Sequence, residues 1–383
     1  MPPAAFEHMG PTLVYVGTYT GPKSEGIYLF SLEPESAGGA QNARLVPRGL
    51  AAASSNPSFL ELDPKRRLLF AVNETSRFEG QPTGAVSAFA IDRTTGMLRL
   101  INQQPSMGGA PCHLVLDRTG RHLLAANYGS GSVAVLPVAA NGRLGAASDV
   151  VQHAGSSVNP QRQQGPHAHC VTVDRANRFV FVCDLGLDKV LAYRFDAQRG
   201  RLTPNDPPFA RVKAGAGPRH MVFRPDGRFA YVVNELSSTV AVFRYDADAG
   251  ALHDVQEVST LPGHFDGENS GAEIDVHPSG RWLYASNRGH NSVVLFAVER
   301  DRGTLTYVED QWTGGLTPRH FGIDRAARYL AVGNQDSDTI LLAALDAGSG
   351  RLKPSGVPAG APSPVCMKFL ELRQGPRGEG RQP

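Results

Sequence analysis

Residues 217–252 carry the pattern that decides the fold: GPRHMVF (217–223), RPDGR (224–228), FAYVVNE (229–235), VAVF (240–243) and GAL (250–252). Short apolar runs alternate here with polar turns that contain Pro, Asp, Gly or Asn. Apolar runs bounded by such turns are typical of β-strands joined as hairpins. The segment therefore predicts consecutive antiparallel strands.

The same pattern recurs along the chain. The turn arginine of this segment, Arg228, has counterparts 47 to 57 residues apart at Arg67, Arg121, Arg178, Arg281 and Arg328. An Asn or Asp follows six residues after each of them, at Asn73, Asn127, Asp184, Asn234, Asn287 and Asn334. This period fits four short strands with their turns and leaves no room for a helix of about 12 residues. Each module is therefore predicted to be a four-stranded antiparallel blade.

The two ends of the chain together supply one more blade. Residues 13–17 and 26–30 match the second and third strands of a module, and residues 364–369 match the missing first strand. Pairing the terminal strands would close a ring and remove exposed sheet edges. The sequence thus predicts an all-β, seven-bladed β-propeller of four-stranded antiparallel blades, closed by its N- and C-terminal strands. It would form one domain over residues 11–372, with a flexible N-terminus at 1–10 and a disordered tail at 373–383.

Charge and composition restrict the kind of partner. The 383 residues include 38 Lys and Arg against 36 Asp and Glu, a net charge of +2. Because no long run of like charges occurs, we expect neither nucleic acid nor a membrane as partner. The first ten residues lack the apolar stretch of a signal peptide, and no stretch is long enough for a membrane helix, so a cytoplasmic location is expected. The widely spaced cysteines are predicted to be buried free thiols: Cys112, Cys170, Cys183 and Cys366.

The blade pattern also predicts which residues surround the axis. In a propeller, the first strand of each blade begins, and the second strand ends, at the same mouth of the central channel. Two columns should therefore ring that mouth: Ser58, Cys112, His169, Arg219, Ala272, Arg319 and Val365 in the first, and Glu74, Tyr128, Leu185, Glu235, Arg288 and Gln335 in the second. Blade scaffolding alone needs no charge at these positions. Consecutive modules nevertheless place His169, Arg219, Glu235 and Arg288 side by side, with Arg319 nearby.

This grouping suits recognition of an anion combined with acid–base chemistry. Guanidinium groups bind carboxylate or phosphate oxygens in bidentate fashion and stabilise developing negative charge. A Glu between cations keeps a low pKa, and a His near them tends to be neutral. Glu235 and His169 could therefore each act as the base, with the other as the acid. The alternative is a set of salt bridges that closes a water-filled channel.

Other histidines are weaker candidates. His167 and His169 would lie on one side of a strand, where they could hold a metal ion, but no third ligand is evident. We therefore expect no metal and no other cofactor. His113, His220 and His320 share one column and are expected to pack or to hydrogen-bond, and the recurring Asn is expected to stabilise a turn.

Several motifs resemble those of the seven-bladed lactonase family, and the resemblance covers nearly the whole chain. They are YVGTYT (15–20), PHAH (166–169), DLG (184–186), GPRH (217–220), YVVNEL (231–236), SNRGH (286–290) and PRHF (318–321). The family includes cytosolic propeller-type 6-phosphogluconolactonases and fungal carboxy-cis,cis-muconate cyclases. In the cyclases a His, two Arg and a Glu have been proposed as the working residues, and their motif positions match His169, Arg219, Arg288 and Glu235.

The resemblance implies a lactonase that hydrolyses 6-phospho-D-glucono-1,5-lactone to 6-phosphogluconate, a step of the pentose phosphate pathway, without a metal. Arg219, Arg288 and Arg319 would hold the phosphate or the oxyanion. Glu235 and His169 would act as acid and base. Further contacts to the substrate are expected from His167, Asn234, Asn287 and Gln335.

Two alternatives stay open at this point. The same residues could serve a muconate-type lactonising cycloisomerase, in which arginines hold the carboxylates of an unsaturated dicarboxylate. A propeller could also be a non-catalytic binding platform. In the enzymatic readings the partner is a small anionic lactone or dicarboxylate, and the sequence does not indicate an oligomeric state.

Overall fold

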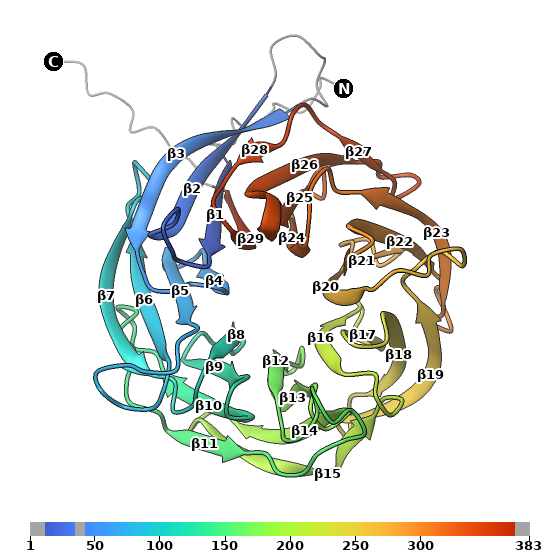
Figure 1. Cartoon of the computed structure of the whole chain (residues 1–383). Coiled ribbons are helices and arrows are strands. Elements are labelled where there is room, and N and C mark those ends of the chain that lie inside the picture. The colour runs from blue at the N-terminus through green and yellow to red at the C-terminus, as the bar shows by residue number, and fades with distance from the viewer. Residues whose placement is uncertain (1–11, 35–42, 372–383) are drawn as a thin grey trace, which may run out of the picture.

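The computed structural model describes residues 12–34 and 43–371, which form a ring of seven antiparallel sheets around a central axis (Figure 1). The predicted all-β, seven-bladed propeller is confirmed. The predicted domain limits at residues 11 and 372, and the predicted flexible or disordered ends at 1–10 and 373–383, lie outside the described residues.

Each blade runs from a strand beside the axis to a strand on the rim. The first three blades are β29 (Pro364–Glu371), β1 (Thr12–Thr18), β2 (Gly26–Pro34) and β3 (Ala43–Ala53); β4 (Leu60–Asp63), β5 (Leu68–Asn73), β6 (Ala85–Ile91) and β7 (Leu98–Pro105); and β8 (Pro111–Leu116), β9 (His122–Asn127), β10 (Ser132–Pro137) and β11 (Asp149–Gln152).

The other four blades follow in the same order around the ring. They are β12 (Ala168–Val173), β13 (Phe179–Asp184), β14 (Lys189–Asp196) and β15 (Arg201–Arg211); β16 (Pro218–Phe223), β17 (Phe229–Asn234), β18 (Thr239–Asp246) and β19 (Ala251–Ser259); β20 (Ser270–Val276), β21 (Trp282–Arg288), β22 (Ser292–Val298) and β23 (Leu305–Trp312); and β24 (Pro318–Ile323), β25 (Tyr329–Asn334), β26 (Thr339–Leu345), β27 (Leu352–Pro354) and β28 (Ala359–Gly360).

The ring closes as predicted, by pairing strands from the two ends of the chain. β29 lies antiparallel to β1, with Val14 opposite Phe369 and Val16 opposite Met367. The first blade therefore takes its inner strand from the C-terminal end and its other strands from the N-terminal end. The last blade departs from the regular pattern, because β27 and β28 share the place of one outer strand beside β26.

Four of the six recurring turn arginines donate to carbonyl oxygens of the next blade: Arg121, Arg178, Arg228 and Arg281. Arg228, in the turn between β16 and β17, donates to the carbonyl oxygen of Asp301 in the next blade (3.2 Å). Arg281 donates in the same way to Ala347 (2.7 Å). The repeat thus preserves an arginine that reaches the following blade.

The Gly-x-Leu of residues 250–252 also recurs in the modules, with its glycines at Gly96, Gly142, Gly200, Gly250, Gly303 and Gly350. Gly303 shows the steric cause of this recurrence. Its φ of +70° lies in the left-handed region, which glycine adopts without strain. A Cβ at this position would stand 2.3 Å from Cδ1 of Phe229 in the preceding blade. The hydroxyl of Tyr231, in that same blade, donates to the Gly303 carbonyl oxygen (3.1 Å). Only glycine allows the two blades to approach this closely.

The core consists of apolar layers between facing sheets. Val14 and Met367 of the first blade, for example, pack with Tyr329 and Leu342 of the last. No helix among the residues described is long and apolar enough to span a membrane. The apolar layers leave the axis itself to polar side chains, and these form the candidate site.

Candidate functional site at the axial mouth

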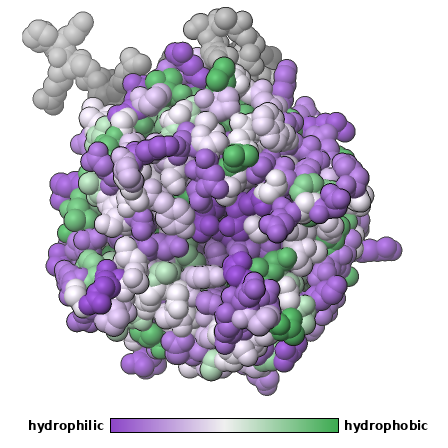
Figure 2. Space-filling model, viewed as in Figure 1, coloured by the Kyte–Doolittle hydropathy of each residue, from purple (hydrophilic) through white to green (hydrophobic). Residues whose placement is uncertain are grey.

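The two predicted columns meet at one mouth of the channel. His169, Arg219 and Arg319 lie on the inner strands β12, β16 and β24, while Glu235 follows β17 and Arg288 ends β21. Seen along the axis, the ring is hollowed at its centre, and hydrophilic side chains gather in the hollow (Figure 2). The channel is thus lined by polar groups rather than filled by the apolar core.

The inner-strand residues of the site lie on β-bulges. Pairing between β12 and β13 shifts at His169, and the pairings of β16 and β24 shift at Arg219 and Arg319. A bulge leaves one residue outside the ladder and turns its side chain in a new direction. The irregularity explains why these side chains are available to the channel.

Glu235 is the centre of an ion-pair cluster. Its Oε2 lies 3.1 Å from Nε of Arg219 and 2.9 Å from Nη2 of Arg288. Its Oε1 accepts a hydrogen bond from Nη2 of Arg162 (2.6 Å). The exposed fraction of the side chain is 2% for Arg219, 7% for Glu235 and 14% for Arg288, so the pairs are largely screened from water.

The cluster fixes its own charge states. Burial opposes ionisation of Glu235, but Arg288, Arg219 and Arg162 outweigh it and lower the pKa of this carboxyl to about 2. Burial, assisted by repulsion from Arg219 and Arg319, lowers the pKa of Arg288 to about 10. At neutral pH Glu235 is therefore ionised and Arg288 is protonated, so a proton is not readily available from Glu235.

His169 is next to this cluster and carries no charge at neutral pH. It is 4% exposed, and its ring centroid lies 5.1 Å from that of His220. Burial, followed by the charge of Arg219, lowers the pKa of His169 well below its usual range. Its Nδ1 is buried and makes no hydrogen bond to the residues described. A neutral imidazole with a free ring nitrogen can accept a proton.

A second charged group lies beside the first. The guanidinium of Arg319 stands 5.3 Å from the ring centroid of Tyr19, and the Tyr19 hydroxyl donates to Oε2 of Glu74 (3.0 Å). Glu74 was in the predicted second column but was not singled out. Tyr19 was missed because the first blade has an incomplete repeat, although its place in the motif YVGTYT was a usable signal.

The four further residues predicted to contact the substrate, besides the arginines, lie in different surroundings. His167 stacks on Tyr128 with ring centroids 4.6 Å apart, and half-buried Gln335 has an Oε1 without a partner among the described residues. Both are at the mouth. Asn234 and Asn287 are fully buried. Their amides donate to Thr239 (3.0 Å) and to the Thr260 carbonyl (2.9 Å).

The expectation that Asn234 and Asn287 contact the substrate stays a prediction, since the buried Oδ1 of Asn234 has no partner among the described residues. The amide of Asn234 bonds across the turn that follows it, to Thr239, as expected of the recurring Asn.

Arg162 is the contact that the repeat could not reveal. It lies between β11 and β12, in residues 153–167, a connection longer than those that join the outer strand of other blades to the next inner strand. Its Nη2 donates to Glu235 and, at 3.3 Å, to the hydroxyl of Tyr128. The greater length of this connection, beside a predicted site residue, is the signal that could have identified it.

Below the mouth, the histidines of the next position pack as predicted. Nδ1 of His220 lies 2.9 Å from Oε1 of Glu273, and His320 Nε2 lies 3.3 Å from Oε2 of the same carboxylate. The His113 ring lies 4.1 Å from Phe59, centroid to centroid. This layer separates the site from the other end of the channel. All four cysteines are buried and free, as predicted.

The opposite end of the axis holds a different set of groups. A cavity of about 410 Å³ is lined by Glu61, Glu273, Asp275 and Lys368, among others. The Lys368 ammonium stands 4.6 Å from the Phe59 ring centroid. Burial raises the pKa of Asp275 to about 7. With its several carboxylates, this end does not present the excess of arginines found at the mouth.

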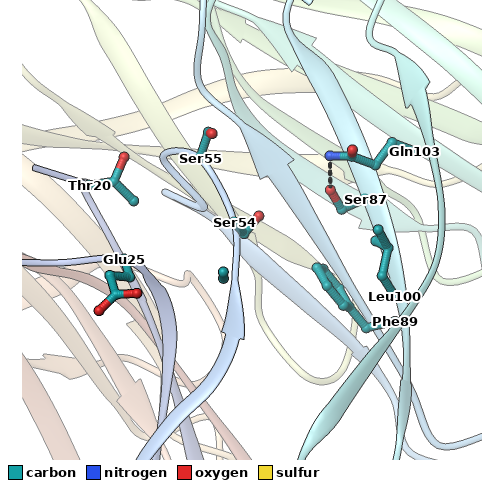
Figure 3. Close-up of a pocket in the computed structure, with 9 residues that line it drawn as sticks. Thr20, Glu25, Ser54, Ser55, Ser87, Phe89, Leu100 and Gln103 are labelled. Atoms are coloured by element: carbon teal, nitrogen blue, oxygen red, sulfur yellow. Dashed lines mark hydrogen bonds between the residues drawn. The ribbon is translucent and has the colours of Figure 1, made fainter.

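A further hollow of about 370 Å³ lies over the first two blades (Figure 3). Thr20, Glu25 and Ser54 line it, and Gln103 donates to Ser87 across its wall (2.9 Å). It contains no basic residue and none of the predicted site residues. We therefore place the candidate site at the axial mouth.

The arrangement at the mouth can bind an anion and accept a proton. Besides His169 and Gln335, Ser58 and Arg288 present buried polar atoms that lack partners among the described residues. Buried polar groups normally have partners, so these atoms are available to a bound molecule. Within the part of the chain that the structure describes, no three His, Cys, Asp or Glu side chains are grouped so that they could hold a metal ion.

The known proteins compared here with this chain are lactonases. The family model described as "Lactonase, 7-bladed beta-propeller" matches residues 13–369. A 6-phosphogluconolactonase of Bacillus subtilis is 36% identical over 93% of this chain and 97% of its own length. One of Formosa agariphila is 32% identical over 89% and 94%. The solved structure of a periplasmic gluconolactonase of Pseudomonas aeruginosa, 36% identical, has a TM-score of 0.86 and covers 94% of this chain and 99% of its own.

Proposed function

Since the chain belongs to the seven-bladed β-propeller lactonase family, we propose that it hydrolyses 6-phospho-D-glucono-1,5-lactone to 6-phosphogluconate. The observation that carries this proposal is the cluster of Arg219, Glu235 and Arg288 beside the neutral His169. The names of two relatives, both 6-phosphogluconolactonases, support the choice of substrate.

The proposed reaction begins with activation of water. His169 accepts a proton from the water as its oxygen attacks C1 of the lactone. The neutral state of His169 supports this role, and the low pKa of Glu235 makes this carboxylate a poorer base. From the sequence, Glu235 and His169 could each be the acid or the base. The charge states in the structure favour His169 as the base.

The oxyanion that forms at C1 needs positive charge. Arg219 and Arg288 are proposed to supply it, since their guanidinium groups are buried and already oriented by Glu235. Such preorganised donors stabilise a transition state because they need not reorient as charge develops. Glu235 acts here through the arginines, as the residue that positions them.

The reaction ends when the bond between C1 and the ring oxygen breaks. The protonated His169 returns its proton to that oxygen, which becomes the C5 hydroxyl of 6-phosphogluconate. One imidazole thus serves as base and then as acid, and the net change is the addition of one water. No covalent enzyme intermediate is needed.

A direct assay tests the function. Purified protein is added to freshly prepared 6-phosphogluconolactone, and the product is followed with 6-phosphogluconate dehydrogenase, with the spontaneous hydrolysis subtracted. We expect turnover well above that background. An unsaturated muconolactone-type substrate is assayed in parallel. Turnover of that compound alone would make the enzyme a cycloisomerase, and turnover of neither would favour a binding platform.

We also propose a cytoplasmic location, where a small anionic metabolite is the partner. The four buried thiols are unpaired, which suits a reducing compartment. One similar protein is periplasmic, so the proposal needs a test. Fractionation of cells that express the full-length protein should place the lactonase with cytoplasmic markers, and recovery with periplasmic markers would reject the proposal.

A further inference from the structure

The segment between β11 and β12 is held rigidly against the neighbouring blade. Nδ1 of His153 lies 2.6 Å from Oδ2 of Asp184. Gln163, which is fully buried, donates its amide to the Leu185 carbonyl (2.8 Å) and to Asp188 (2.8 Å). These contacts stand on both sides of Arg162 in the sequence. The segment therefore presents the Arg162 side chain from a fixed backbone.

Arg162 differs from the other arginines around Glu235. Its side chain is 41% exposed, against 2% for Arg219 and 14% for Arg288. Arg219 and Arg288 also donate to backbone carbonyls, Arg219 Nη1 to Ala272 (2.6 Å) and Arg288 Nη2 to Gly271 (3.0 Å). Arg162 uses only Nη2 in bonds to the described residues. Its Nε and Nη1 groups make no bond to the described residues, and the side chain is exposed, so they are free to bind two further oxygens.

The net positive charge of the mouth suits a ligand with two negative charges. Four guanidinium groups, of Arg162, Arg219, Arg288 and Arg319, face the carboxylates of Glu235 and Glu74, which leaves two positive charges uncompensated. A phosphate monoester carries a charge of about −1.5 to −2 at pH 7. An unphosphorylated sugar lactone is neutral and gains much less from this excess.

We propose that Arg162 binds the 6-phosphate of the substrate and so selects phosphorylated over unphosphorylated lactones. This inference rests on the proposed function. The phosphate is attached through C6 to C5, the carbon that bears the leaving ring oxygen. When C1 lies beside His169 and the buried arginines, the phosphate extends toward the solvent-facing opening of the mouth, where Arg162 is exposed. Arg162 then shares its guanidinium between Glu235 and the phosphate.

The test compares two lactones and two variants. Wild-type protein, Arg162→Gln and Arg77→Gln are assayed on 6-phosphogluconolactone and on glucono-1,5-lactone. For Arg162→Gln we expect the ratio of the two kcat/KM values to fall at least tenfold, mainly through KM for the phosphorylated lactone. Arg77 is exposed on the loop that follows Glu74, so Arg77→Gln removes the same charge from the same face and should leave the ratio unchanged.

Binding measurements separate this inference from the proposed function. The affinities of 6-phosphogluconate and gluconate are measured by calorimetry for the same three proteins. If the wild type hydrolyses neither lactone, the proposed function fails, yet Arg162 is still supported if its loss removes a preference for 6-phosphogluconate. An equal loss with both lactones, or an unchanged ratio and an unchanged preference, would overturn the inference.

Discussion

Replacement of Glu235 by Gln is the substitution whose effect follows most directly from the contacts at the mouth. Among the described residues, Glu235 is the carboxylate that contacts Arg162, Arg219 and Arg288. Glu235→Gln keeps the shape of the side chain and removes its charge. Three guanidinium groups would then surround a neutral amide.

The expected cost comes mainly from the most buried of these groups. Arg219 is 2% exposed, and its Nη1 is held by the Ala272 carbonyl, so it cannot turn toward water. Removing one partner of a buried ion pair typically costs about 3–5 kcal/mol. Arg162 is half-exposed and can be hydrated, so we take the lower end, about 3 kcal/mol. With an unfolding entropy of about 2 cal/mol/K per residue over about 350 residues, the melting temperature should fall by roughly 4 °C.

Thermal unfolding followed by calorimetry measures this difference. Glu33→Gln is the matched control, because its ion pair with Arg48 is exposed, with 32% and 49% of the two side chains accessible. Exposed pairs contribute about 1 kcal/mol or less. If Glu235→Gln melts within about a degree of Glu33→Gln, the arginines are hydrated and the description of a closed charge cluster is wrong.

Three further predictions concern the oxyanion, the histidines and the contacts between blades. Arg288→Met should lower kcat about 100- to 1000-fold, the usual loss for one oxyanion donor, and a loss below tenfold in steady-state assays would remove Arg288 from that role. Burial lowers the pKa of His169 and His220 well below the ordinary value, and that of His320 to about 3. Below pH about 6.5 the unfolded chain therefore binds more protons than the folded protein, and the protein loses stability as the pH falls. Below pH about 6.5, each histidine lowers the free energy of unfolding by about 1.4 kcal/mol for each pH unit. Asp275, with its raised pKa of about 7, has the opposite effect and offsets one histidine. A melting temperature that stays constant from pH 7 to 5 would contradict this prediction. Tyr231→Phe should cost about 1 kcal/mol in denaturant unfolding, because the Gly303 carbonyl loses its partner from the preceding blade, and an unchanged midpoint would show that this bond is dispensable.

The fold could be predicted in detail because the information is repeated. The turn arginine, the Asn or Asp and the Gly-x-Leu each recur, and the structure shows a physical reason for each. Arg228 reaches the next blade, Asn234 bonds across its turn to Thr239, and Gly303 allows two blades to approach. Closure by residues 364–369 also followed from the repeat, since one strand was missing at one end and present at the other. The split outer strand of the last blade had no such signal.

The site was only partly predictable, because its residues are departures from the repeat. Position in a column identified His169, Arg219, Glu235 and Arg288 as neighbours. The neighbouring arginines also indicated a low pKa for Glu235 and a neutral His169, and both directions agree with the structure. Position in a column could not show which of the two is the better base, since that depends on burial and on distances between blades. Arg162 lies in a connection that is longer than its counterparts, so no comparison within the chain could align it.

The central claim is that neutral His169 activates water beside the arginine cluster. Its most direct test is the pH dependence of kcat/KM for 6-phosphogluconolactone, measured for the wild type and for His169→Asn. The wild type should keep full activity down through pH 6.5, the usual pKa of histidine, and lose it only at lower pH. His169→Asn should be at least about 100-fold slower and should lack that acidic limb. A variant that keeps more than a tenth of the activity, with the same limb, would contradict the claim.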